Sequence, residues 1–83
     1  MGHFFQLNIY SQEKTVYSGE IISLVAPAES GYLGVLAHHA PMIANLIAGK
    51  IKIKDKEGKE NVMELHSSGF LEVVKNVATI LLV

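Results

Sequence analysis

The sequence predicts an all-β fold, a single-domain two-layer antiparallel β-sandwich of about ten short strands over residues 1–83. Apolar and polar side chains alternate with a period of two through much of the chain, and glycines and other turn residues recur about every ten residues. β-branched residues are frequent, and no segment has the periodicity of an amphipathic helix longer than about two turns. These features favour two packed sheets over a helical fold.

The expected strands begin near the N-terminus. The apolar positions of the opening strand alternate with Gln6 and Asn8 and are Phe5, Leu7 and Ile9. Ser18 and Gly19 indicate a turn, after which a second strand carries an apolar face formed by Ile22, Leu24 and Ala26. The segment 42–48 fits either a buried strand or one to two turns of helix.

The C-terminal half gives the clearest pattern. Lysines alternate with Ile51 and Ile53, residues 55–58 form a turn, and the chain runs back, so residues 50–66 read as a hairpin. Residues 67–69 interrupt the strands, and a strand at 70–74 and a tight turn at 75–76 follow. The last strand places four residues on one face, namely Val77, Thr79, Leu81 and Val83.

Composition points towards a protein partner. The chain is 49% hydrophobic and 18% charged, has no cysteine and carries a net charge of −1, with lysines as its only basic residues besides histidine. A nucleic-acid-binding domain would show a basic excess, so that class is excluded. Disulfides and thiolate metal sites are excluded as well. The apolar excess in so short a chain suggests that a partner covers part of the surface.

A membrane span is the first alternative for the uncharged residues 30–49, which are long enough to cross a bilayer. The segment contains His38, His39, Asn45 and Pro41, which argue against a spanning helix. Any membrane association is therefore expected to be indirect.

Catalytic and metal sites find little support. His38 and His39 are adjacent and would point to opposite faces of a strand, and His3 and His66 are far away in sequence. Ser67-Ser68-Gly69 lacks the helix of a nucleophile elbow, and the loop with Gly31 and Gly34 lacks the lysine and helix of a phosphate site. No catalytic residue, metal or cofactor is predicted.

Two loops with few charges remain as candidate contact sites, and both are expected at one end of the sandwich. The residues expected to contact a partner are Ala28, Glu29, Ser30, Gly31, Tyr32, His38, His39, Ala40, Pro41 and Met42. The residues expected to shape the loops, through special backbone angles or close approach, are Gly31, Gly34, Pro41 and Gly69.

These residues resemble one family, the epsilon subunit of the F-type ATP synthase, in its N-terminal β-sandwich. The family's Gly-x-Leu-Gly-(Val/Ile)-Leu-Pro-x-His-Ala-Pro loop is matched at Gly31, Leu33, Gly34, Val35, Leu36, His39, Ala40 and Pro41. Tyr17–Glu20 resembles its Tyr-Ser-Gly-Glu turn, and the stretches 68–73, 76–77 and 79–81 resemble its closing strands. Ala37 replaces a usual proline and Ser68 a glycine. The resemblance covers essentially the whole chain.

The resemblance implies a non-catalytic central-stalk subunit that docks on gamma and the ring of c subunits and couples proton-driven rotation to ATP synthesis in the complex with alpha and beta. By position, residues 28–32 and 38–42 resemble the loops that face the c ring. The implied location is peripheral, at the cytoplasmic face of the bacterial plasma membrane. The family's C-terminal helical hairpin has no counterpart in residues 1–83. Two alternatives stay open: a free-standing β-sandwich module that binds a ligand or peptide, and a metal-dependent enzyme using His38, His39 and His66.

Overall fold

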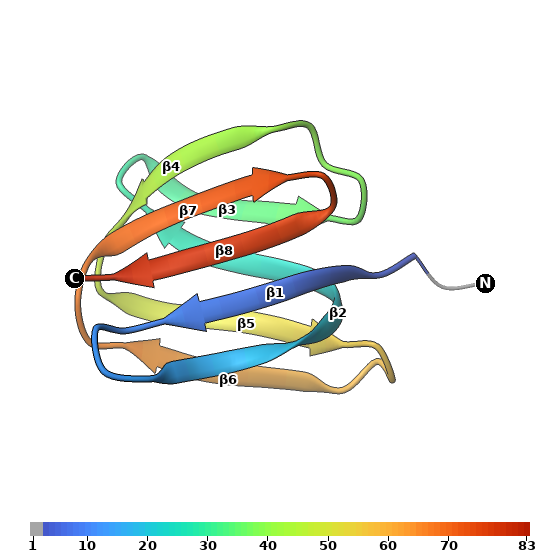
Figure 1. Cartoon of the computed structure of the whole chain (residues 1–83), viewed down its shortest axis with the longest axis horizontal. Helices are drawn as coiled ribbons and strands as arrows, with labels where there is room; N and C mark the ends of the chain where they lie inside the picture. Colours follow the sequence, from blue (N-terminus) through green and yellow to red (C-terminus); the bar gives the residue numbers. More distant parts are fainter. Residues whose placement is uncertain (1–2) are drawn as a thin grey trace.

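The computed structural model describes residues 3–83, and every regular element in that range is a β-strand (Figure 1). The all-β prediction is confirmed, although the expected count of about ten strands is wrong, because eight are present. Their bounds are β1 Phe5–Tyr10, β2 Thr15–Ala28, β3 Gly31–Leu36, β4 Met42–Leu46, β5 Gly49–Asp55, β6 Glu60–Leu65, β7 Gly69–Val74 and β8 Val77–Leu82. The segment that fitted strand or helix is thus a strand, β4. None of the described elements is a helix that could cross a membrane.

The long strand β2 explains the smaller count. Its 14 residues pass through Ser18 and Gly19 without a break, since both pair with β1 at this point. The predicted turn at Tyr17–Glu20 is therefore wrong. The strand instead bends at a bulge where Ile22 is the extra residue between partners of β5. The bulge also turns Ile21, and not Ile22, into the core beside Leu24.

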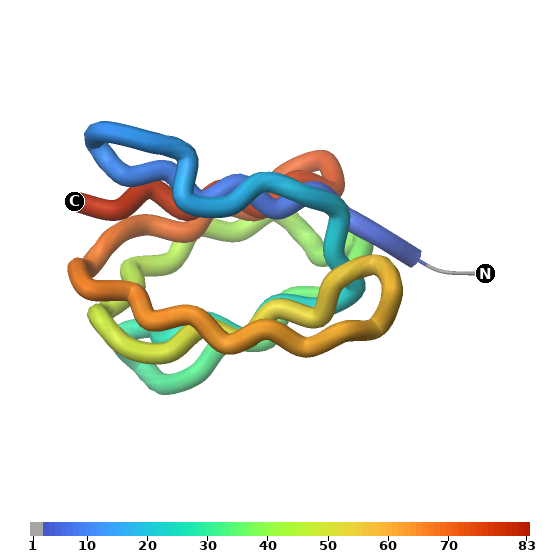
Figure 2. The backbone as a smooth tube through the Cα atoms, turned by 90° about the horizontal axis from the view of Figure 1, so that it is seen from below, coloured from blue at the N-terminus to red at the C-terminus, as the bar shows by residue number. Residues whose placement is uncertain are grey.

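Because β2 bends, it belongs to both layers. Its first half pairs with β1 in a layer that continues through β8 and β7 to β4, and its second half pairs with β3 and β5 in a layer that ends at β6. Figure 2 shows the two layers on either side of the core. The strand pairs are antiparallel except β1 with β8, which is parallel and corrects the fully antiparallel prediction. These two strands lie at opposite ends of the sequence, so no short connection forces them to run antiparallel.

Alternating side chains fill the space between the layers. Ile51 and Ile53 are fully buried while the alternating lysines at 50, 52 and 54 are exposed, which confirms the predicted hairpin of β5 and β6. On β8 the buried residues are Ala78 and Ile80, so the predicted face of Val77, Thr79, Leu81 and Val83 is the outer one. One connected apolar cluster results, and among residues 3–83 no polar side chain is buried within it.

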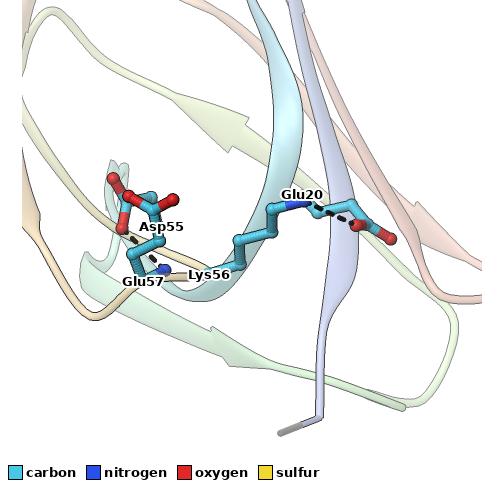
Figure 3. Close-up of polar contacts among 4 residues, drawn as sticks. All are labelled: Glu20, Asp55, Lys56 and Glu57. Atoms are coloured by element: carbon cyan, nitrogen blue, oxygen red, sulfur yellow. Dashed lines mark hydrogen bonds and ion pairs between the residues drawn. The ribbon is translucent and has the colours of Figure 1, made fainter.

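The β5–β6 turn shows how local polar contacts end a strand. The Asp55 carboxylate accepts hydrogen bonds from the backbone N–H of Glu57 at 3.0 Å and of Lys59 at 2.9 Å. Lys56 extends from this turn to Glu20 on β2, with 3.7 Å between Nζ and Oε1 (Figure 3). Both side chains of the pair are more than half exposed, so the pair adds little stability. The turn is thus held by the Asp55 carboxylate together with two backbone hydrogen bonds, from the N–H of Asp55 to the carbonyl oxygen of Lys59 and from the N–H of Gly58 to that of Asp55.

Candidate functional site

The two predicted contact loops lie at opposite ends of the sandwich, so the expectation that they share one end is wrong. Glu29 and Ser30 form the turn between β2 and β3, and residues 37–41 connect β3 to β4 (Figure 1). The six residues of β3 separate the two loops, and six residues of extended strand span about 17–20 Å. Sequence order alone made them look like neighbours.

The loop before β4 is held by an asparagine from another turn. The backbone N–H of His38 donates to Asn76 Oδ1 at 2.7 Å, and Asn76 Nδ2 donates to the carbonyl oxygen of Phe4 at 2.8 Å. Lys75 and Asn76 have φ angles of 50° and 63°, as in a type I′ hairpin turn. Asn76 thereby joins the N-terminal segment, the β7–β8 turn and the contact loop. Sequence reasoning noted this residue only as part of a turn.

The histidines of this loop have local roles. His38 itself has a φ of 64°, a left-handed conformation that histidine adopts more readily than most residues. Its ring packs edge-on against His3, with 5.8 Å between centroids. His39 Nδ1 lies 2.7 Å from the carbonyl oxygen of Ala40, in the turn before Pro41. Ala37, the residue in place of the family's proline, is partly buried against the core.

The turn between β2 and β3 has its own supports. Gly31 has a φ of 125°, which explains the glycine there, and the N–H of Glu29 donates to the carbonyl oxygen of Asn45 at 3.1 Å. Asn45 Nδ2 also reaches Glu29 Oε1 at 3.4 Å. Next to the turn, the Tyr32 side chain is 71% exposed.

The other two glycines predicted to shape the loops behave differently. Gly69 is buried, and a Cβ there would press against the carbonyl group of Leu81 and lie 3.2 Å from the Cα of Leu82. Gly34 lies within β3 with ordinary φ, and a Cβ there would meet nothing within 4 Å. The loop-shaping role predicted for Gly34 is therefore wrong, while Gly69 is required by close packing.

An apolar patch that sequence reasoning did not identify covers the outer face of β4, β7 and β8. Ile43 is 77% exposed, Leu81 52% and Phe70 51%, and Phe70 and Leu81 are cross-strand partners. Two shallow hollows, of about 400 and 210 Å³, lie on either side of Ile43 and Glu72. Glu72 is exposed, and its cross-strand neighbours are Ile43 and Thr79. Only strand register brings these residues together, which is why the linear pattern hid the patch.

The histidines considered as alternative metal ligands do not come together in the part of the chain that the structure describes. The loop with His38 and His39 lies at one end of the sandwich, and His66 follows β6 at the other. Among residues 3–83, no three histidine, aspartate or glutamate side chains gather as metal ligands. Among the described side chains, Tyr17 has a shifted pKa. Burial of the phenol raises this pKa above its usual value, and the negative charge of the nearby Asp55 raises it further. Tyr17 lies on β2 and packs against the core.

Fold and surface together define a small β-sandwich domain whose chemically distinctive features are its exposed apolar faces. The chain belongs to the family described as ATP synthase, Delta/Epsilon chain, beta-sandwich domain, whose model matches residues 4–82. It is 42% identical over 77 residues to the ATP synthase epsilon chain of Dichelobacter nodosus and 38% identical over 79 residues to that of Leptospira borgpetersenii. The resemblance seen in the sequence is therefore confirmed.

Solved structures show the same fold. The chain aligns with a subunit of the Euglena gracilis mitochondrial ATP synthase, solved as OSCP/F1/c-ring, with a TM-score of 0.88, 21% identity and coverage of 99% of this chain and 52% of that one. A central stalk/c-ring structure from Tetrahymena thermophila gives a TM-score of 0.75. The two curated relatives are covered over 53% and 61% of their length, and 93% and 95% of this chain takes part. The chain thus spans little more than half of the relatives it matches.

Proposed function

We propose that this chain is the β-sandwich of a non-catalytic central-stalk subunit of an F-type ATP synthase, which links gamma to the c ring and transmits rotation. The observation that carries the proposal is the family match over residues 4–82 together with two exposed apolar regions on a rigid sandwich. A close-packed interior resists deformation, which suits a part that passes torque between two partners. The chain reaches the cytoplasmic face of the bacterial membrane only through the complex.

The outer face of β4, β7 and β8 is the proposed gamma-binding face. Ile43, Phe70 and Leu81 form its apolar centre, and Pro41 of the β3–β4 loop borders it. Large apolar side chains at the centre of a patch carry most of the energy of a protein interface. The loop with His38 and His39 would then contact gamma rather than the c ring.

The end with the β2–β3 turn is the proposed c-ring contact. Residues 28–32 present Tyr32 there, and Ile47 is exposed in the adjacent turn between β4 and β5. Because the two loops lie at opposite ends, a single flat contact with the c ring cannot include both. In this proposal residues 28–32 contact the c ring, as the family resemblance implies, whereas residues 38–42 contact gamma instead of the c ring.

Disulfide trapping in the assembled complex tests the two ends separately. The chain has no cysteine, so Ser30→Cys and His39→Cys each introduce one thiol on a clean background. With cysteines placed on gamma and on the polar loops of the c ring, Ser30→Cys is expected to cross-link to c and His39→Cys to gamma. Exchanged partners would overturn the assignment of the ends.

The gamma-binding face is tested by affinity. Ile43→Asp places a charge in the centre of the patch and is expected to weaken gamma binding about tenfold or more. Val62→Asp is the matched control, since Val62 is an exposed strand residue of the other layer, 56% exposed. Circular dichroism of both variants would show an intact fold. If wild-type chain does not bind gamma at all, the free-standing binding module becomes the better description.

A further inference from the structure

The free edge of β3 carries unpaired backbone groups that the proposed function leaves unused. β3 pairs with β2 alone, so its other side is an edge of the second layer. Over the described range, residues 3–83, no backbone hydrogen bond from a turn or loop reaches that side. An exposed strand edge of this kind is a template on which another strand can pair.

The pairing of β2 shows which residues of β3 point outward. Pro27 has no N–H, and its carbonyl oxygen accepts from the N–H of Ile47 at 2.9 Å. Pro27 and its partner Tyr32 are therefore a non-hydrogen-bonded pair. Because such pairs alternate with hydrogen-bonded ones along an antiparallel ladder, Gly34 and Leu36 are of the same kind. The N–H and C=O groups of Tyr32, Gly34 and Leu36 thus face away from β2.

The side chains along this edge carry no charge. Tyr32 is 71% exposed and Leu36 63%, and both stand on the outer face with Gly34 between them. A Cβ at Gly34 would meet nothing within 4 Å, so the middle of the strand is open to approach. Strand edges in proteins are often protected by a lysine, a proline or a bulge, and residues 31–36 have none of these.

The other free edge of this layer has the protection that β3 lacks. β6 pairs with β5 alone and places Glu60 and Glu64 on either side of Val62. In a pair of β6 strands centred on Val62, each Glu60 would stand opposite a Glu64, and like charges directly opposite are destabilising. The edge of β3 has no such conflict with a copy of itself.

We propose that the free edge of β3 pairs antiparallel with β3 of a second copy of this chain, about a two-fold axis at Gly34. In this register Gly34 stands opposite Gly34 of the other copy, and each Tyr32 stands opposite a Leu36. Three residues of each strand exchange both backbone hydrogen bonds, which gives about six in all. The interface is isologous, so it closes as a dimer.

The side chains fit this register. Large apolar side chains that stand opposite one another stabilise a strand pair. The order of large, absent and large side chains at Tyr32, Gly34 and Leu36 is symmetric about Gly34, which favours a second copy over an unrelated strand. The Tyr32 rings can cover the gap left by the two glycines. A single strand edge buries less area than a stable complex needs, so we expect a weak dimer with a Kd of about 1 mM.

The first test is self-association of the 83-residue chain, followed by its translational diffusion in NMR between about 0.05 and 2 mM. We expect a monomer at the low end of this range and a large dimer fraction at the high end. Gly34→Lys places two like charges beside the two-fold axis and is expected to raise Kd at least about tenfold. Val62→Lys is the matched control on the β6 edge, at a side chain that is 56% exposed, and should change Kd less than about twofold.

Disulfide formation tests the register. Residues of a hydrogen-bonded pair have Cα atoms about 5.5 Å apart, which is within the range that a disulfide spans. The chain has no cysteine, so Gly34→Cys gives one thiol that can pair only with the same thiol of a second copy. Under mild oxidation it is expected to form covalent dimers at least about tenfold faster than Val62→Cys, the matched control.

Equal effects of Gly34→Lys and Val62→Lys, or equal cross-linking of the two cysteine variants, would overturn the proposal. So would a chain that stays monomeric at every concentration, and a strand of another protein would then be the occupant to seek.

Dimerisation of the free chain does not depend on the proposed function. The gamma-binding face is formed by β4, β7 and β8, so gamma binding is expected to stay unchanged in Gly34→Lys. A failure of the β3 pairing is therefore distinguishable from a failure of the proposed function.

Discussion

Asn76 is the residue whose replacement tests the structure most directly. Its side chain makes two hydrogen bonds to backbone groups 38 and 72 residues away in sequence, and its own φ is 63°. Asn76→Ala removes both hydrogen bonds and places alanine in the left-handed region, where its Cβ is unfavourable and no polar side chain compensates. Asn76→Gly removes the same hydrogen bonds but fits that backbone conformation.

The two variants separate the two contributions. Each hydrogen bond contributes about 0.5–1.5 kcal/mol, and both are partly solvent-accessible, so Asn76→Gly is expected to cost about 1–2 kcal/mol. The left-handed conformation adds about 1 kcal/mol for alanine, which gives about 2–3 kcal/mol for Asn76→Ala. In a domain of this size the larger loss lowers Tm by on the order of 10 °C.

Urea unfolding followed by circular dichroism measures both losses at equilibrium. Hydrogen exchange at the His38 amide adds a local readout, because that N–H donates to Asn76 and should exchange faster in both variants. Asn76→Gly within about 0.5 kcal/mol of wild type, with unchanged exchange at His38, would refute the assigned role of the side chain. Equal stability of the alanine and glycine variants would refute the backbone argument.

Three further variants test packing and titration. Gly69→Ala is expected to lower the free energy of unfolding by about 3 kcal/mol, because its Cβ meets the carbonyl of Leu81. Gly34→Ala is the control and should change it by less than about 0.5 kcal/mol, since a Cβ there meets nothing within 4 Å. Equal losses for the two variants in urea titrations would contradict the packing argument. The raised pKa of Tyr17 means that the unfolded chain releases its phenolic proton first, so stability is complete below about pH 10 and falls as pH rises towards the folded-state pKa. Tyr17→Phe should flatten that fall in unfolding experiments between about pH 9 and 11, and pH profiles identical to those of the wild type would sink the assignment.

The interior could be read from the sequence wherever alternation was regular. The lysine–isoleucine alternation of β5 predicted both the buried face and the hairpin, since exposure of lysine and burial of isoleucine are strong opposing preferences. The turn predicted at Ser18 and Gly19 is absent, although serine and glycine are both frequent in turns. Pairing with β1 overrides that preference and keeps β2 continuous.

The surfaces were decided by register and connectivity. Ile43, Phe70 and Leu81 come from three strands, and no local pattern shows that β4, β7 and β8 lie side by side. The bridge made by Asn76 likewise joins residues far apart in sequence.

The sequence by itself determined that this is a β-sandwich of the epsilon type, because side-chain alternation and the Gly31–Pro41 motif are local. Only the tertiary structure decided that the two contact loops lie at opposite ends, because a single strand, β3, carries the chain from one end to the other.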